Sequence, residues 1–237
     1  MNFTAAQLAA AFDSTNLRLD ATEADITALC EEAVVHRFAC VMLYPTSVVH
    51  AVRVLAGTGM RIGTVVGFPS GRFSPEAKLA EIVAARVAGA HEVDVVMNYA
   101  ALRAGDLQWV DGELRAVVRA AHAHGMLIKI IVETCYLDAD QRICALRLCE
   151  DAGADFIKTS TGFGLAGAQV DHIAGWAAAR RGPIRLKASG GIKTFAQARA
   201  LLEAGATRLG TSNAVQLLAE FTSGGGGDAA SVSGGGY

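Results

Sequence analysis

Two lysines and an aspartate are the strongest candidates for chemistry, because each lies within an apolar run that predicts a buried strand. Lys158 lies in ADFIKTSTG, Lys187 in IRLKASGG and Asp94 in HEVDVVMN. A buried charge is costly unless it is paired or has a purpose. Two buried ammonium groups held close together lower each other's pKa, and a lysine with a lowered pKa is a free amine near neutrality. Such an amine attacks carbonyl groups, while the second, charged lysine can move a proton with Asp94 and a water.

A charge network that ties the strands together is the competing interpretation of these residues. For a single buried lysine it would be the better one. Two lysines on neighbouring strands, each followed by a glycine-rich loop, favour catalysis instead. Lys129, early in LIKIIVET, is predicted to lie toward the bottom of a barrel as an ion-pair residue, and the spacing leaves the role of Glu133 open.

Three short loops rich in glycine and hydroxyl residues predict a phosphate site. Each follows a predicted strand: Ser160-Thr161-Gly162, Ser189-Gly190-Gly191 and Gly210-Thr211-Ser212. Glycine lets backbone N–H groups approach an anion closely, and a helix N-terminus adds a favourable dipole. Glycine pairs also serve ordinary tight turns, so the prediction depends on three such loops in adjacent positions.

The sequence predicts no metal site and no cysteine or serine nucleophile. The six histidines form no HExxH motif and no cluster with cysteine, and no GxSxG is present. The five cysteines are odd in number and include no CxxC pair, as expected of reduced thiols in a cytoplasmic protein. We therefore expect neither a metal nor a cofactor.

The apolar pattern predicts eight short strands separated by helices. Several strand candidates are nearly continuous apolar runs, which is typical of parallel strands buried on both faces. The predicted strands are Phe12–Asn16, Phe38–Tyr44, Arg61–Gly67, Glu92–Asn98, Leu127–Thr134, Ala154–Ser160, Ile184–Ser189 and Thr207–Thr211. The predicted helices are Glu23–His36, Pro75–Ala88, Leu107–His124, Ala139–Ala152, Val170–Arg180, Thr194–Glu203 and Asn213–Phe221.

Glycines mark where several of these helices end. The phrases VAGAHEVDVV, DAGADFIKTS and EAGATRLGTS each combine a helix end at Gly89, Gly153 or Gly205 with a tight loop and a strand. Eight strand–helix units in this length predict a single-domain α/β protein, a closed (β/α)8 TIM barrel over residues 1–221. An open doubly wound sheet is the alternative, but no GxGxxG follows the first strand.

The composition fits one globular domain. The chain has 237 residues and a net charge of −2. Its 52% of hydrophobic residues and 19% of charged residues exclude a disordered chain. No apolar run approaches the roughly 18 residues that cross a bilayer, and the first residues lack the basic start of a signal peptide. Without a basic cluster, nucleic acid is not an expected partner. Residues 222–237, rich in Gly and Ser, are predicted to be a flexible tail.

With these residues in this order, the chain resembles the 2-deoxyribose-5-phosphate aldolases. The matching motifs, from about Asp13 to Phe221, are DSTNL at Asp13–Leu17, VGFPSG, EVDVV, LIKIIVET, DFIKTSTGF and LKASGGIK. KTSTG is the most specific of them, and the GG and GTS loops are less so. The resemblance implies a class I aldolase, a lyase of the same barrel fold that needs no metal. It would reversibly split 2-deoxy-D-ribose 5-phosphate into D-glyceraldehyde 3-phosphate and acetaldehyde, in deoxyribonucleoside catabolism.

The resemblance also implies a role for each site residue. Lys158 would form the Schiff base, Lys187 would keep it deprotonated, and Asp94 would join a proton relay through water. Asp13 and Thr15 would support the lysines and the sugar hydroxyls. The substrate contacts on the phosphate loops would come from Thr161, Gly162, Gly190, Gly191 and Ser212.

A few positions depart from the pattern of the family. Phe163 stands where some relatives have a lysine that contacts phosphate, Met42 replaces a cysteine, and Asn213 stands where a second serine is frequent. We expect these changes to tune substrate preference and to leave the chemistry intact. Some relatives end in a tail whose last residue is tyrosine, so Tyr237 is predicted to assist proton transfer at C2 of the substrate.

Two other functions compete with the aldolase. One is another phosphate-binding barrel enzyme, similar to a transaldolase or an epimerase. The other is a barrel that only binds a sugar phosphate and regulates or scaffolds. An epimerase would not need the amine of Lys158, and the intact set of Lys158, Lys187 and Asp94 speaks against a binding-only barrel. The oligomeric state is left open, with a homodimer as one candidate.

Overall fold

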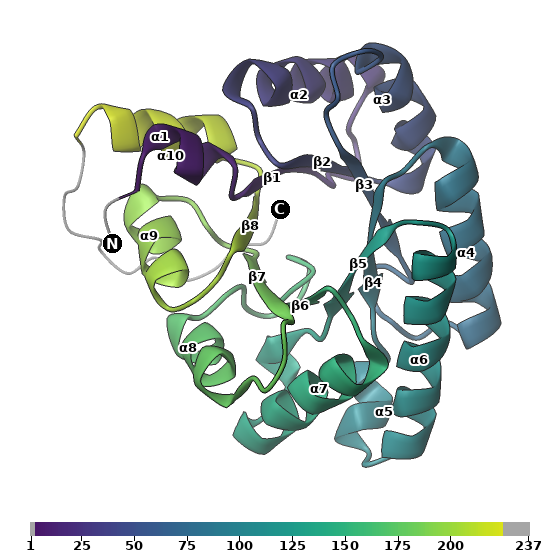
Figure 1. Ribbon diagram of the computed structural model, residues 1–237. Coiled ribbons are helices and arrows are strands. Elements are labelled where there is room, and N and C mark those ends of the chain that lie inside the picture. The colour runs from purple at the N-terminus through teal and green to yellow at the C-terminus, as the bar shows by residue number, and fades with distance from the viewer. Residues whose placement is uncertain (1–2, 225–237) are drawn as a thin grey trace.

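The computed structural model describes residues 3–224, in which eight parallel strands close into a barrel surrounded by helices (Figure 1). Each strand pairs with its neighbours in sequence order, and β8 closes the barrel against β1. The predicted (β/α)8 TIM barrel is confirmed, and the open sheet is wrong. The strands are β1 (Phe12–Asn16), β2 (Cys40–Leu43), β3 (Ile62–Val66), β4 (Glu92–Val96), β5 (Leu127–Ile131), β6 (Phe156–Lys158), β7 (Arg185–Ser189) and β8 (Arg208–Thr211).

Helices form the outer layer of the barrel (Figure 1). The longer ones are α2 (Glu23–His36), α3 (Val48–Val54), α4 (Pro75–Ala88), α6 (Leu107–Ala123), α7 (Ala139–Ala152), α8 (Val170–Ala179), α9 (Phe195–Glu203) and α10 (Ala214–Thr222). Two short helices, α1 (Ala5–Ala9) and α5 (Tyr99–Arg103), and the 3-10 turns η1 (Pro45–Ser47) and η2 (Thr134–Tyr136) complete the described elements. Within residues 3–224, no helix combines the length and the apolar character needed to span a membrane.

The sequence analysis missed three helices, α1, α3 and α5. α1 and α5 have five residues each, which is too short for a helical period to show. α3 is VVHAVRV, and its four valines have a low helix propensity because they are β-branched. Helix α10 runs to Thr222, one residue past the predicted end of the barrel.

The glycines of the three repeated sequence segments lie at helix ends, as predicted. Gly89 and Gly153 are the C-caps of α4 and α7, with φ of 103° and 78°. Gly205 lies just after α9 with φ of 116°. Because a side chain is disfavoured at positive φ, glycine at these positions ends the helix and turns the chain into the next strand.

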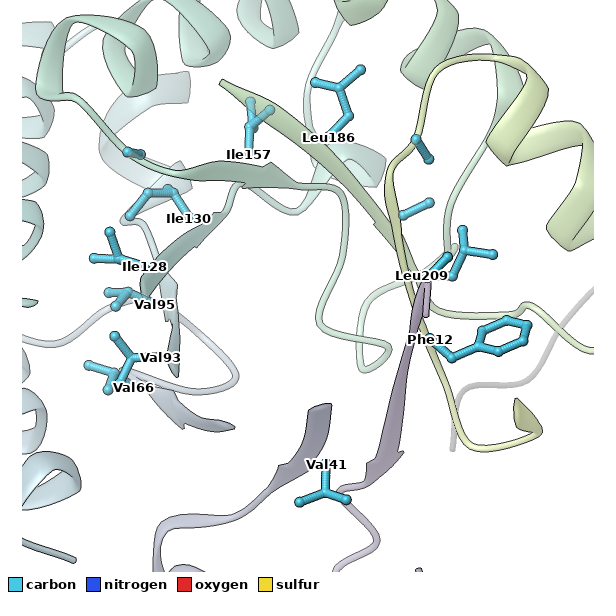
Figure 2. Close-up of a cluster of buried hydrophobic side chains, with 14 of the residues drawn as sticks. Phe12, Val41, Val66, Val93, Val95, Ile128, Ile130, Ile157, Leu186 and Leu209 are labelled. Atoms are coloured by element: carbon cyan, nitrogen blue, oxygen red, sulfur yellow. The ribbon is translucent and has the colours of Figure 1, made fainter. Parts of the chain in front are cut away.

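Apolar side chains on alternate strand positions fill the layer between barrel and helices. Figure 2 shows ten of them labelled, from all eight strands, and all ten belong to one buried cluster. Since successive side chains of a strand point to opposite faces, the residues between them point into the barrel. On β4, for example, Val93 and Val95 face the helices, so Asp94 faces the interior.

A buried ion pair joins α4 and α6 outside the barrel. Lys78 Nζ donates to the carboxylate of Glu113 and, at 2.7 Å, to the carbonyl oxygen of Val96. Glu113 Oε2 accepts from the N–H of Asn98 at 3.0 Å. Both charged side chains are buried. The pair therefore holds two helices against the C-terminal end of β4, the strand that carries Asp94.

Replacing only one partner of the Lys78–Glu113 pair should lower the free energy of unfolding more than replacing both partners. Glu113→Leu leaves the ammonium of Lys78 buried without its counter-ion, so we expect the free energy of unfolding to fall by about 3–5 kcal/mol. The double variant Lys78→Met/Glu113→Leu should recover more than half of that loss. Asp111→Ala breaks an exposed pair with Arg115 on the same helix and should cost less than about 1 kcal/mol. Urea unfolding followed by circular dichroism compares them, and equal costs for the two single variants would contradict the expectation.

Candidate active site

Strand pairing brings the predicted catalytic residues together inside the barrel. Lys158 and Lys187 are register partners on β6 and β7, and Asp94 and Lys129 are partners on β4 and β5. All four side chains are buried. The predicted neighbourhood of the two lysines and Asp94 is therefore present, and the interior of the barrel is charged at positions where such barrels usually carry bulky apolar residues.

Asp94 is shared by three lysines. Its Oδ2 accepts from Lys158 Nζ at 2.7 Å and from Lys187 Nζ at 2.8 Å. Its Oδ1 accepts from Lys129 Nζ at 2.8 Å, so the predicted ion-pair role of Lys129 is confirmed. Burial alone would raise the pKa of Asp94, but the three ammonium groups hold that pKa well below its ordinary value. Asp94 is therefore an ionised anchor for the lysines.

Two further carboxylates complete the network below Asp94. Asp13 Oδ2 accepts from Lys187 Nζ at 2.5 Å, and Glu92 Oε2 lies 2.7 Å from Lys129 Nζ. Lys187 is ion-paired with two carboxylates and Lys129 with three, because Asp13 Oδ2 also lies 3.8 Å from Lys129 Nζ. Lys158 is paired with Asp94 alone among the described residues. Lys158 is therefore the lysine of the three with the fewest carboxylate partners.

The amine of Lys158 is also the one that a substrate can reach and that titrates near neutrality. Lys158 is 3% exposed, and the other three buried lysines are 0% exposed. Burial lowers the pKa of Lys158 from 10.5 to about 8; Asp94 opposes the shift, and Lys187 and Lys129 add to it. At pH 7 a lysine with a pKa of 8 is a free amine about one time in ten, compared with about one in three thousand at 10.5.

The sequence analysis did not single out Glu92 or Arg208, although both belong to this network. Arg208 Nη1 donates to Asp13 Oδ1 at 2.6 Å and lies 3.6 Å from Glu92 Oε2. Glu92 lies two positions before Asp94, so the two-residue period of β4 could have placed it on the same face. Thr15 supports the backbone here, because its hydroxyl donates to the carbonyl oxygen of Asp13 at 2.9 Å.

The loops after β6 and β7 pack backbone against backbone. A Cβ on Gly167 would lie 2.1 Å from the carbonyl oxygen of Gly190, so only glycine permits this approach. The N–H of Ala168 donates to the same oxygen at 3.1 Å. Within residues 3–224, the N–H groups of Gly162, Gly190 and Gly191 donate to no protein acceptor. They are therefore available to bind an anion.

The other predicted substrate contacts lie at the same end of the barrel, which we call the mouth: the C-terminal ends of the strands and the loops that follow them. Ser212 is exposed directly after β8, and its hydroxyl donates to Asn213 Oδ1 at 3.1 Å. Phe163, in the loop after β6, packs edge-on against Phe68 with ring centroids 5.3 Å apart, and Phe68 packs on Tyr44 at 5.8 Å. These rings link the loops after β2, β3 and β6.

One buried group has the geometry of a metal site. Asp13, Cys40 and Glu92 each offer a ligand atom, all within 4.8 Å of one another. Both carboxylates are ion-paired with Arg208, and burial raises the pKa of the Cys40 thiol well above its ordinary value. The donor set therefore fits an ion-pair network, and we propose no metal here. Tyr237 and the predicted tail from residue 225 on lie outside the described residues.

Comparison with known proteins agrees with the predicted family. Residues 7–222 match the family described as DeoC/LacD family aldolase. Deoxyribose-phosphate aldolase of Aciduliprofundum boonei is 44% identical over 214 residues, which cover 90% of this chain and 96% of that protein. The enzyme of the same name from Deinococcus radiodurans is 44% identical over 219 residues, covering 92% and 99%.

A solved structure agrees as well. It is described as a tetrameric deoxyribose phosphate aldolase from Aeropyrum pernix and matches with a TM-score of 0.87 and 33% identity over 93% of each chain. The resemblance found in the sequence is thus confirmed. The chain belongs to the DeoC/LacD family of aldolases and is therefore a lyase.

Proposed function

We propose that the chain is a class I aldolase that reversibly cleaves 2-deoxy-D-ribose 5-phosphate to D-glyceraldehyde 3-phosphate and acetaldehyde through a Schiff base on Lys158. The observation that carries the proposal is the environment of Lys158: a buried amine with a pKa of about 8 and a single carboxylate partner. The names of the relatives support the choice of substrate.

The amine of Lys158 attacks the aldehyde carbon C1, and loss of water gives a protonated imine. A base removes the proton of the C3 hydroxyl, the C2–C3 bond breaks, and its electron pair moves into the imine to give an enamine. D-Glyceraldehyde 3-phosphate leaves. Protonation of the enamine at C2 and hydrolysis of the imine release acetaldehyde and regenerate the amine.

Lys187 moves protons in this proposal, and Asp94 positions Lys187 beside the reacting amine. Asp94 Oδ2 bonds both Lys158 and Lys187, so one carboxylate oxygen connects the reacting amine with a second ammonium group. Because Asp94 is a weak base at its lowered pKa, it orients the relay, and Lys187 and a water carry the proton. Asp13 holds Lys187 from the opposite side.

The loops at the mouth bind the phosphate in this proposal. The N–H groups of Gly162, Gly190 and Gly191, together with Ser212, supply donors for a dianion. Thr161 borders this site, but its N–H and hydroxyl both donate to Glu133. The phosphate lies away from the reacting bond, so its binding energy orients the sugar over Lys158. The division into a barrel and a tail, the cytoplasmic location, the catabolic role and the homodimer stay predictions.

Trapping the imine tests the reacting residue. Acetaldehyde followed by borohydride should place an ethyl group on Lys158, located by peptide mapping, because the reduced imine is stable. Lys158→Ala should abolish the adduct and lower kcat by more than about a thousandfold. Lys193→Ala removes the exposed lysine of the chain. This variant should keep the adduct on Lys158 and the wild-type kcat. A folded protein that gives no adduct on Lys158 would refute the Schiff base.

The pH dependence of imine formation tests the environment of that amine. The free amine is the reactive form, so the trapping rate should rise with pH and level off above about pH 8. Lys187→Met removes a neighbouring cation and leaves more of the charge of Asp94 to Lys158. Both effects raise the pKa of Lys158, so the rise should move to higher pH by roughly one unit. Trapping rates between pH 6 and 10 measure it, and a shift to lower pH would be inconsistent with the proposal.

Tyr237 is proposed to assist protonation at C2. Tyr237→Phe should slow the exchange of the acetaldehyde methyl protons with deuterated water by about tenfold or more, followed by NMR. Borohydride trapping on Lys158 should stay at the wild-type rate, because imine formation needs no proton transfer at C2. Unchanged exchange and unchanged turnover would remove Tyr237 from the mechanism.

A further inference from the structure

Glu133 has a backbone conformation that side chains rarely adopt. It directly precedes the turn η2, with φ of 53° and ψ of 67°. In residues 3–224 the only other non-glycine residue with positive φ is Arg37, which caps the end of α2. A left-handed residue is common at a helix end, but Glu133 has no helix before it. Such a residue persists when its surroundings fix it, and it often marks a functional site.

The side chain of Glu133 holds the loop that follows the strand of Lys158. Its carboxylate accepts the hydroxyl of Thr161 and also the N–H of Thr161, at 3.2 Å to Oε2 and 3.3 Å to Oε1. The hydroxyl oxygen of Thr161 in turn accepts from the N–H of Phe163 at 3.0 Å. Glu133 therefore fixes two alternate N–H groups of the loop, one directly and one through Thr161.

The N–H between those two is the one that the protein leaves free. Gly162 lies between Thr161 and Phe163, has φ of 93°, and donates to no acceptor among residues 3–224. When its two neighbours are turned toward Glu133, the N–H of Gly162 is held in a single orientation. The bonds to Glu133 therefore set the direction of a predicted phosphate donor.

Two further contacts hold the same loop against its surroundings. A Cβ on Gly164 would lie 3.1 Å from the carboxylate of Glu133 and 2.9 Å from the Cys135 sulfur, so the loop runs directly over this side chain. Across the mouth, the ring of Phe163 packs against Phe68. The loop after β6 is thus held by hydrogen bonds to Glu133 and by the packing of Phe163 against Phe68.

No cation forms an ion pair with this buried carboxylate among residues 3–224. Burial raises the pKa of Glu133, although the ammonium of Lys158 is near enough to oppose this rise. Glu133 is 1% exposed, and in the described part of the chain no lysine, arginine or histidine nitrogen lies within 4 Å of its oxygens. Buried carboxylates are usually paired with a cation. The hydrogen bonds from Thr161 stabilise the ionised carboxylate more than the charge of Lys158 does, so the main structural role of Glu133 lies in the loop after β6.

We infer that Glu133 is a positioning residue for the phosphate subsite, which orients the N–H of Gly162 toward the phosphate of the substrate without touching the reacting atoms. The inference rests on the proposed function. It separates phosphate binding from the chemistry at Lys158, because a change at Glu133 should affect substrates that carry a phosphate and spare acetaldehyde.

Glu133→Gln tests this, because a carboxamide has one acceptor oxygen in place of two. We expect KM for 2-deoxy-D-ribose 5-phosphate to rise about tenfold, while kcat and the borohydride trapping rate with acetaldehyde stay within about twofold of wild type. Thr161→Val removes the hydroxyl that donates to Glu133 and should raise KM by a similar factor. Thr161→Ser keeps the hydroxyl and should keep the wild-type KM.

Glycine variants separate the side chain from the backbone turn. Arg37→Gly and Glu133→Gly both place glycine at a positive φ that suits it. If the turn alone mattered, both would keep the wild-type KM. We expect Arg37→Gly to do so and Glu133→Gly to raise KM at least as much as Glu133→Gln.

The outcomes distinguish this inference from the function on which it rests. A wild-type enzyme that does not cleave 2-deoxy-D-ribose 5-phosphate overturns both. An active wild type with an unchanged KM in Glu133→Gln and Glu133→Gly overturns the inference alone. So does a fall in kcat and trapping rate without a rise in KM, because Glu133 would then act on the chemistry. If Glu133→Gln does not fold, the KM of Thr161→Val decides in the same way.

Discussion

The carboxylate of Asp94 is the interaction on which the interior of this barrel depends. Alternating positions on β5, β6 and β7 aim three ammonium groups at the centre of a closed sheet, and Asp94 bonds all of them. Asp13 and Glu92 then give Lys187 and Lys129 a second carboxylate each, which Lys158 lacks. This unequal sharing leaves Lys158 with a single carboxylate partner, and burial lowers the pKa of its amine to about 8.

Chemistry and substrate anchoring are divided between two kinds of structure. The reacting amine and its partners stand on strands, whose outer faces are packed into the large apolar cluster (Figure 2). The proposed anchors are backbone N–H groups of loops, and glycines let those loops touch one another. A site built this way keeps its charged groups rigid, while the loops determine which substrate is held over them.

The sequence predicted the strands and the central residues because both leave a clear pattern. A charge such as Asp94 between Val93 and Val95 is conspicuous in an apolar run. Arg208 is not, because a charge at the start of a strand is ordinary, and only the pairing of β8 with β1 brings it to Asp13. The φ of Glu133 leaves no mark in the sequence at all, and the valines of α3 obscure a helix that tertiary packing stabilises.

Burying so many lysines leaves a surface with an unusual chemistry. Of the five lysines, only Lys193 is exposed, and sixteen of the 21 basic residues are arginines. Guanidinium groups stay protonated and do not form imines readily, so dissolved aldehydes meet a single reactive side-chain amine on the outside of the fold. Lys193 follows the loop after β7, at the mouth. If the protein is immobilised on a solid support that carries aldehyde groups, the side-chain attachment point would therefore be Lys193. The mouth of the barrel would then face the support.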